Sequence, residues 1–383
     1  MMAAANFRAS SRPRRGTDPC AEGRSNSIWS RIGVLLAAMV LGGCAAPPLM
    51  SYSVDTPPLV VAPAAQAGIQ DKRARFREIF CAVLEARRET TPDYRPCDEA
   101  LTRLRAEPAG TGRPVDLTPS RRRLVLALVP GFGYDCFENW LEAPATAVEH
   151  LRRHGYDLSL IHVEGLSGTE RNARLIRDAL VAQPAESGAP RLVLVGYSKG
   201  ANDVLEALVT YPELRPRVAA FVSVAGTIGG SPLANDASQD MAELLVHFPG
   251  AKCTAGDRGA VASLRPDTRR AWLAANPLPR DIPYYSVVTF PQPERISAIL
   301  RTPYEKLSSV DARNDSQAIF YDQVIPDSAL LAYANADHWA VAVPIARTHT
   351  TIAELFVTQN AYPREVLAEA ILRFVEEDLE KGR

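Results

Sequence analysis

The chain has 383 residues, of which 46% are hydrophobic and 23% are charged, and its formal net charge at pH 7 is −1. These proportions are ordinary for a soluble globular protein and supply enough apolar residues for one large core or two smaller ones. Because there is no excess of basic residues to contact phosphates, we expect no nucleic-acid partner.

Residues 1–43 have the order of a secretory signal peptide, with an Arg-rich leader followed by a short apolar run from Ile32 to Leu41. That run is too short to span a bilayer as a stable helix, and its length is typical of the apolar region of a signal peptide. It ends in Leu41-Gly42-Gly43-Cys44, which resembles the bacterial lipoprotein signal, where small residues admit the peptidase and the cysteine thiol accepts a lipid. The resemblance implies an exported protein with a lipid on Cys44.

The residues that follow this cysteine bear on location and reach. By resemblance to enterobacterial lipoproteins, Ala45 after Cys44 favours the outer membrane. We therefore expect a protein lipid-anchored in the bacterial cell envelope, facing the periplasm or the exterior. Residues 44–67 are rich in proline and alanine, and proline both prevents regular structure and stiffens the chain, so we expect a tether here.

The remainder divides into a helical part and an alternating part. Residues 68–116 carry apolar side chains at helical spacing, and Asp98 can cap a second short helix to Leu104, which predicts a small N-terminal helical hairpin. Over residues 117–383, short apolar runs alternate with helical patterns, which is typical of an α/β fold with a mostly parallel central sheet. The expected strands are Leu124–Val129, Leu158–Val163, Leu192–Val195, Val218–Val224, Tyr284–Phe290 and Ser328–Tyr333. The expected helices of this part are Phe137–His154, Glu170–Val181, Lys199 to about Tyr211, and Pro363–Leu379.

A long interval, about residues 226–281, interrupts the alternation between two of the expected strands. It contains helical patterns near Gln239–His247 and Arg265–Ala275. Long insertions are often functional, so we expect a helical cap insertion here.

The strongest chemical motif is Gly196-Tyr197-Ser198-Lys199-Gly200, which follows an apolar strand and opens a helical pattern. This is the context of a nucleophile elbow, where a strained turn exposes the serine hydroxyl at the end of a strand. Small residues two places before and after the serine let the strand and the helix approach closely, and Gly196 and Gly200 supply them. The motif predicts Ser198 as a catalytic nucleophile.

In this context the chain resembles the α/β-hydrolase superfamily, in particular bacterial esterases and lipases, over roughly residues 121–383. The resemblance implies an oxyanion hole of two backbone N–H groups, one on Phe132 in Val129-Pro130-Gly131-Phe132-Gly133 and one on Lys199. Pro130 stands where lipases often have histidine, but the donor is a backbone group, so the chemistry is kept. For the Lys199 side chain, a position in solvent and a position near the acyl or anionic part of the substrate both remain open.

The superfamily orders its triad as serine, acid and histidine, with the histidine just after the last strand. Of the six histidines, His338 fits this order and is the predicted base. His150 and His154 have charged neighbours on a predicted helix, so we expect both to be solvated.

The acid should lie between the strand that ends near Phe290 and the histidine His338. Asp315, in Arg313-Asn314-Asp315-Ser316-Gln317, resembles the acid of the Asn-Asp-Gly loop of bacterial lipases and is the preferred candidate. Asp322, in Tyr321-Asp322-Gln323-Val324, is the alternative.

Four cysteines remain after Cys20 in the signal and Cys44 at the anchor, namely Cys81, Cys97, Cys136 and Cys253. An even number in an exported protein suggests disulfides, with three possible pairings. Cys81 and Cys97 flank the turn of the hairpin and form the natural local pair, which leaves Cys136 with Cys253. Four buried thiols are the alternative.

These features predict a serine hydrolase that cleaves a small-molecule or lipid ester through an acyl-enzyme and meets the membrane through its lipid anchor. The chain has no zinc-type spacing of His and Cys and no phosphate loop, so we expect neither a metal nor an organic cofactor. Two alternatives remain open: a non-catalytic envelope lipoprotein that uses the scaffold for binding, and an acyltransferase or thioesterase on the same fold.

Overall fold

The computed structural model describes residues 68–104, 107–122, 124–140, 143–182, 191–237, 246, 251–254 and 256–381. All of them belong to one unit, Pro48–Arg383. The signal peptide, the anchor cysteine Cys44 and the tether that the sequence predicts lie outside the described residues.

A single sheet of parallel strands runs through the described part of the chain, in the order β1-β7-β6-β5-β4-β2-β3. The strands are β1 Gln70–Asp71, β2 Leu124–Val129, β3 Asp157–Leu160, β4 Arg191–Tyr197, β5 Val218–Val224, β6 Tyr284–Thr289 and β7 Ala329–Ala334. Residues of β5, β6 and β7 are buried throughout, as expected for strands covered on both faces. All six expected strands are present, whereas β1 has only two residues and gives no detectable pattern.

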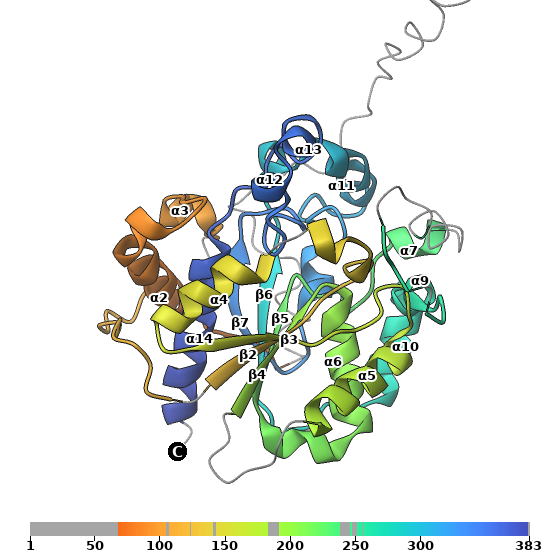
Figure 1. Cartoon of the computed structure of the whole chain (residues 1–383), viewed down its shortest axis with the longest axis horizontal. Helices are drawn as coiled ribbons and strands as arrows, with labels where there is room; N and C mark the ends of the chain where they lie inside the picture. Colours follow the sequence, from red (N-terminus) through yellow and green to blue (C-terminus); the bar gives the residue numbers. More distant parts are fainter. Residues whose placement is uncertain are drawn as a thin grey trace, which may run out of the picture. The chain divides into compact units, whose positions relative to one another are not determined.

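Helices cover both faces of the sheet (Figure 1). On one face lie α2 Arg73–Ala86, α4 Ala143–Arg153 and α14 Arg364–Lys381, and on the other lie α5 Thr169–Val181 and α6 Lys199–Thr210. The shorter helices are α3 Cys97–Ala100, α7 Leu233–Asp236, α9 Ala260–Ser263, α10 Pro266–Ala275, α11 Arg301–Ser308, α12 Ile345–Thr348 and α13 Thr350–Leu355. Short 3₁₀ helices are η1 Arg88–Thr90, η2 Asp135–Trp140, η3 Pro212–Arg217, η4 Pro293–Arg295, η5 Ala298–Leu300 and η6 Phe320–Gln323. None of the described helices is long and apolar enough to cross a membrane.

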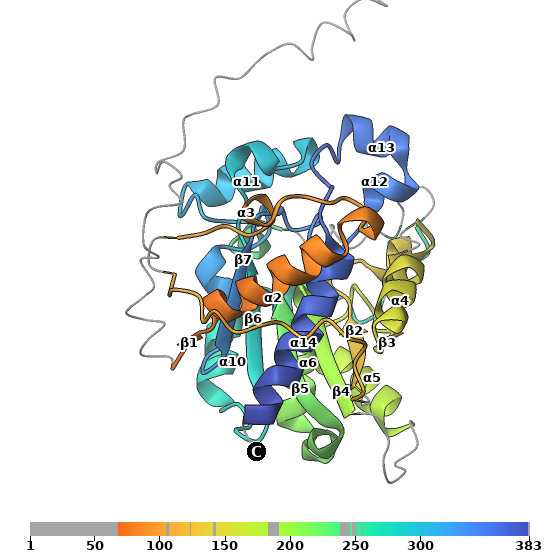
Figure 2. The ribbon, with the colours of Figure 1, turned by 90° about the vertical axis from the view of Figure 1, so that its left-hand side faces the viewer.

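The N-terminal helices share the core of the sheet. Figure 2 shows α2 lying across the same face as α14, and the rings of Phe76 and Phe374 meet edge to face with centroids 6.0 Å apart. The expected cap at Asp98 is wrong: α3 begins one residue earlier, at Cys97. It ends at Ala100 because Leu101 is extended and bridges to Ala334 at the end of β7.

The interval around residues 226–281 divides between two places. Trp272 and Leu273 of α10 pack against the core on the α5–α6 side, whereas Val246, Ala251 and Cys253 pack beside the loop that follows β2. Apart from Val246, the helix expected near residues 239–247 lies outside the described residues.

Three helices that the sequence did not reveal lie together at one end of the sheet in both views (Figures 1 and 2), namely α11, α12 and α13. The segments that carry them are joined by a hydrogen bond from Ile299 N to Phe356 O, at 3.0 Å. The chain reaches α11 after β6 and α12 after β7, so these helices adjoin the carboxyl ends of the strands.

Candidate active site

Ser198 occupies the turn between β4 and α6, with φ 56° and ψ −128°, a strained backbone conformation for a residue with a side chain. The glycines around it permit this turn. A Cβ on Gly196 would lie 2.5 Å from the Cα of Ala201, and a Cβ on Gly200 would lie 2.5 Å from the carbonyl oxygen of Pro130. Strand and helix therefore approach as the elbow motif requires.

Three of the predicted site residues come together at the carboxyl ends of the strands. The Oγ atom of Ser198 lies 2.8 Å from Nε2 of His338, and Nδ1 of the same ring lies 2.7 Å from Oδ2 of Asp315. Ser198 is 7% exposed and His338 is 4% exposed, so water has little access to this chain of hydrogen bonds. An imidazole that donates from Nδ1 to a carboxylate leaves Nε2 free to accept the serine proton.

The carboxylate of Asp315 is fully buried and saturated with hydrogen bonds. Its Oδ1 accepts from the backbone N–H groups of Gln317 and Ala318, at 2.9 and 2.8 Å. Its Oδ2 accepts from Oγ1 of Thr289 at 2.5 Å, in addition to His338. These donors fix the orientation of the carboxylate.

Hydrogen bonds of its backbone also fix the position of His338. Its N–H donates to the carbonyl of Asp315 at 3.0 Å, and its own carbonyl accepts from the hydroxyl of Tyr197 at 2.8 Å. Just upstream, Asn335 N donates to the carbonyl of Ala100 at 2.9 Å. The N-terminal helices thus support the end of β7, which carries the histidine.

The alternative acid, Asp322, lies elsewhere, in η6. Its carbonyl accepts from Gly229 N at 2.8 Å, whereas the ring nitrogens of His338 lie against Asp315 and Ser198. Burial raises the pKa of the Asp322 carboxyl to about 7, against the attraction of Arg270. Asp315 is therefore the carboxylate that meets the histidine.

The backbone N–H groups expected to form the oxyanion hole belong to Phe132 and Lys199. Within the described residues, neither the N–H of Phe132 nor that of Lys199 has a hydrogen-bond partner. The residue before Phe132 touches the elbow, because a Cβ on Gly131 would lie 2.6 Å from the Cβ and 3.1 Å from the Oγ of Ser198. Backbone N–H groups without a partner suit an oxygen that gains negative charge.

Residues 130–136, called the oxyanion loop below, are held from two directions. Gly133 N donates to the carbonyl of Gly165 at 3.2 Å, and Gly165 N donates to Oδ1 of Asp135 at 3.0 Å. On the other side, a disulfide joins Cys136 to Cys253. A second disulfide joins Cys81 to Cys97, so the structure has the pairing that the sequence favoured.

The Lys199 side chain takes neither of the two positions considered from the sequence, in solvent or near the substrate. The side chain is 1% exposed, and its Nζ lies 2.8 and 2.9 Å from the two carboxylate oxygens of Asp203. The charge is therefore neutralised inside the protein and faces neither solvent nor substrate. Lysine and aspartate four residues apart on a helix were the available sequence signal for this pair.

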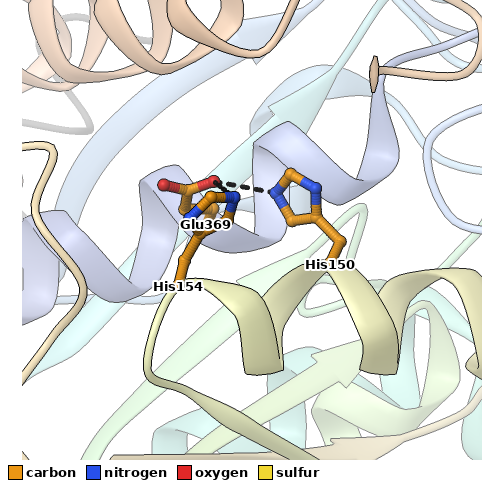
Figure 3. Close-up of side chains that lie close together, drawn as sticks. All are labelled: His150, His154 and Glu369. Atoms are coloured by element: carbon orange, nitrogen blue, oxygen red, sulfur yellow. Dashed lines mark hydrogen bonds and ion pairs between the residues drawn. The ribbon is translucent and has the colours of Figure 1, made fainter.

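The described residues contain one group with the composition of a metal site, His150 and His154 of α4 and Glu369 of α14 (Figure 3). Nε2 of His150 lies 2.8 Å and Nε2 of His154 lies 3.7 Å from Oε2 of Glu369. The other carboxylate oxygen accepts from Arg373 at 2.8 Å and from Arg87 at 3.3 Å. Because two guanidinium groups oppose a cation here, we interpret the group as a polar clamp between helices.

This clamp corrects the expectation that both histidines are solvated. His150 is 3% exposed, and burial together with the charge of Arg87 lowers the pKa of His154 to about 4, against the attraction of Glu369. Their partner is 215 or more residues away in the sequence, so their charged neighbours on the helix gave no sign of it.

An apolar cavity of about 120 Å³ lies between the sheet and the layer of α4 and α14. Its lining includes Pro130 of the oxyanion loop and Tyr197 next to the nucleophile, but neither Ser198 nor His338. We therefore do not place in this cavity the group of a substrate that would react with Ser198.

Comparison with known proteins places this geometry in a family. No protein-family model and no curated protein matches the chain. Among solved structures it is similar to the metagenomic carboxyl esterase MGS0156, with 41% sequence identity, a TM-score of 0.77, and coverage of 85% of this chain and 97% of that one. It is also similar to the Bacillus licheniformis lipase BlEst2 in mature form, with 18% identity, a TM-score of 0.46, and coverage of 63% and 95%. The chain belongs to the α/β-hydrolase superfamily, among the carboxyl esterases.

Proposed function

We propose that the protein is a serine hydrolase that cleaves carboxylic esters through an acyl-enzyme, with Ser198, His338 and Asp315 as its triad. The observation that carries the proposal is the continuous chain of hydrogen bonds from Ser198 Oγ through the imidazole to Asp315, at 2.8 and 2.7 Å. The proposed substrate is a small-molecule or lipid ester, in line with the carboxyl esterase to which the chain is 41% identical.

In the first half of the reaction, Ser198 Oγ attacks the ester carbonyl carbon while Nε2 of His338 takes the hydroxyl proton. The carbonyl oxygen becomes negative and accepts hydrogen bonds from the N–H groups of Phe132 and Lys199. Each such donor is worth on the order of 3–4 kcal/mol of transition-state stabilisation. The imidazolium then gives its proton to the leaving alkoxide, and the alcohol departs.

In the second half, water attacks the acyl group on Ser198 while His338 takes a proton from that water. The same oxyanion donors act again, and the imidazolium gives its proton to Ser198 Oγ as the bond to the acyl group breaks and the acid product leaves. Asp315 keeps the imidazole in the tautomer that presents a lone pair at Nε2, and it stabilises the charged ring that forms at each proton transfer.

We further propose that the protein is exported, that residues 1–43 are removed as a signal peptide, and that a lipid is attached at Cys44. The sequence pattern before this cysteine supports export, and so do two disulfides, which persist in oxidising compartments. The variant Cys44→Ser should release the protein from the membrane fraction or leave its precursor uncleaved. Equal lipid labelling of the wild type and the variant would contradict the anchor.

The test of the function is hydrolysis of a series of p-nitrophenyl esters by the wild type and by Ser198→Ala. We expect the variant to lose at least about 10⁴-fold in kcat, because removal of the nucleophile of a triad is among the largest single losses known. The fold should survive, since the variant removes one oxygen atom. Retention of more than a few per cent of activity by a folded variant would overturn the assignment.

A further inference from the structure

We propose that Asn172 is a positioning residue that couples the two oxyanion donors to each other. The inference rests on the proposed function, because it concerns the N–H groups of Phe132 and Lys199. Asn172 lies on the first turn of α5 and is fully buried. Its side chain joins the support of the oxyanion loop to the support of the nucleophile elbow.

The first link runs from the oxyanion loop to the segment that follows β3. Gly133, next to Phe132, donates its N–H to the carbonyl of Gly165 at 3.2 Å, and Asp135 Oδ1 accepts from Gly165 N at 3.0 Å. The two backbones touch, since a Cβ on Gly165 would lie 2.6 Å from Gly133 N. Any movement of Gly165 must therefore move the loop that carries the Phe132 N–H.

The second link is the amide of Asn172. Its Oδ1 accepts from Glu164 N at 3.1 Å, and its Nδ2 donates to the carbonyl of Glu164 at 3.0 Å. The remaining hydrogen of Nδ2 is donated to Oδ2 of Asp203 on α6, at 2.8 Å. A side-chain amide has the two donors and the acceptor that these three contacts require, whereas a carboxylate has no donor.

The third link is the buried ion pair on α6. Asp203 is 1% exposed, and burial raises its pKa against the opposing attraction of Lys199. Nζ of Lys199 contacts both carboxylate oxygens of Asp203, so the side chain of the residue that carries the second N–H is held by this carboxylate. A movement of Asn172 would therefore displace Asp203, and through it Lys199, whose backbone N–H is the second oxyanion donor.

Because oxyanion donors act through their fixed position, a small displacement of one relative to the other lowers turnover, and misplacement by about 1 Å can cost about 100-fold. A purely structural role for Asn172 would lower stability and leave turnover of the folded enzyme unchanged. The two roles are therefore separable by kinetics on folded protein.

The test is Asn172→Ala in the full chain, with Asn360→Ala as matched control. Asn360 is 2% exposed, and its amide likewise bridges backbone groups, donating to Val343 O at 2.9 Å and accepting from Ala346 N at 3.1 Å. We expect Asn172→Ala to lose about 10- to 100-fold in kcat with KM within about threefold. Its affinity for an alkyl boronic acid, which places an oxygen in the oxyanion hole, should fall in step with kcat/KM. The midpoint of its pH–rate profile should not move, since the triad is intact.

The control variant should lose melting temperature while keeping kcat within about twofold of the wild type. If Asn172→Ala does not fold, the double variant Lys199→Met/Asp203→Asn removes both buried charges together and keeps both backbone N–H groups. It should show the same type of loss in kcat. Wild-type kcat and boronic acid affinity in either folded variant would overturn the inference.

A separate experiment tests the proposed function, namely the reaction of the wild-type protein with a fluorophosphonate probe. A wild type that resists the probe would overturn the proposed function and this inference with it. A labelled wild type whose Asn172 variant keeps full turnover would overturn this inference alone.

Discussion

In the site that we propose, the acid–base side, formed by Asp315 and His338, and the oxyanion side, formed by Phe132 and Lys199, are held in place differently. On the acid–base side, four donors converge on one fully buried carboxylate, and backbone hydrogen bonds fix the histidine. On the oxyanion side, neither N–H has a hydrogen-bond partner within the described part of the chain, and the supports that we propose for them are close glycine contacts, a disulfide and the amide of Asn172.

The difference follows from the chemistry of each side. A carboxylate that must stay charged inside the protein needs hydrogen bonds of its own, so its geometry is fixed by the groups that it binds. An oxyanion donor must leave its hydrogen without a partner until the substrate binds, so its position has to be fixed by contacts of the surrounding backbone and side chains. Mutations on the first side should therefore act by removing a partner, and mutations on the second by releasing a support.

The largest effect is expected on the acid–base side. The variant Asp315→Asn should lose about 10³- to 10⁴-fold in kcat, because an amide that donates toward Nδ1 stabilises the wrong imidazole tautomer. Steady-state kinetics on folded protein measures this loss. A smaller loss than in Asp322→Asn would transfer the role of acid to Asp322.

A smaller loss of turnover is expected when the oxyanion loop is released. In Cys136→Ser/Cys253→Ser, we expect kcat of the folded enzyme to fall about 10- to 100-fold, because a support of the donor loop is lost. The bond joins cysteines with a sequence separation of 117 and the loop-entropy model gives it roughly 5 kcal/mol, so stability should fall as well. Kinetics must therefore be measured well below the melting temperature, and unchanged kcat there would contradict positional control by this bond.

The other disulfide supplies the comparison. Cys81–Cys97 has a sequence separation of 16 and is worth roughly 3 kcal/mol in the same model. Its Cys97 begins α3, and the backbone of α3 is already hydrogen-bonded to the residue that follows β7, the strand that leads to His338. We expect Cys81→Ser/Cys97→Ser to lower the melting temperature and to leave kcat within about threefold. Equal kinetic losses in the two double variants would show that the sides do not differ.

The smallest effect on turnover is expected for Asp322→Asn, with kcat within about twofold of the wild type. The folded-state pKa of Asp322 is raised to about 7 from an ordinary value of 3.8, so the fold favours the protonated form. That contribution to stability is present below about pH 4 and is lost as pH rises through about 7. The variant should therefore gain roughly 1–3 kcal/mol relative to the wild type at pH 8 compared with pH 4, measured by denaturant unfolding. An unchanged difference between the two pH values would contradict the raised pKa.

The same contrast explains how far the sequence predicted the site. Ser198 and His338 could be predicted from the sequence because the elbow motif, its strand context and the chain order leave few other candidates. Asp315 could be predicted because its loop resembles that of bacterial lipases. The partners of Lys199 and of His150 were missed, since a local pattern does not show that a charged residue will be buried against another element. The location of α11 near the site was missed as well, because a helix of eight residues with mostly polar neighbours gives a weak pattern.

The most direct test of the central claim is to locate the residue that a fluorophosphonate probe modifies in the active wild-type protein. Peptide mapping should find the adduct on Ser198, because only a serine whose proton can pass to His338 reacts readily with such a probe. Asp315→Asn should react far more slowly, and Ser198→Ala should not react at all. An adduct on another serine, or an active enzyme that takes up no probe, would contradict the account.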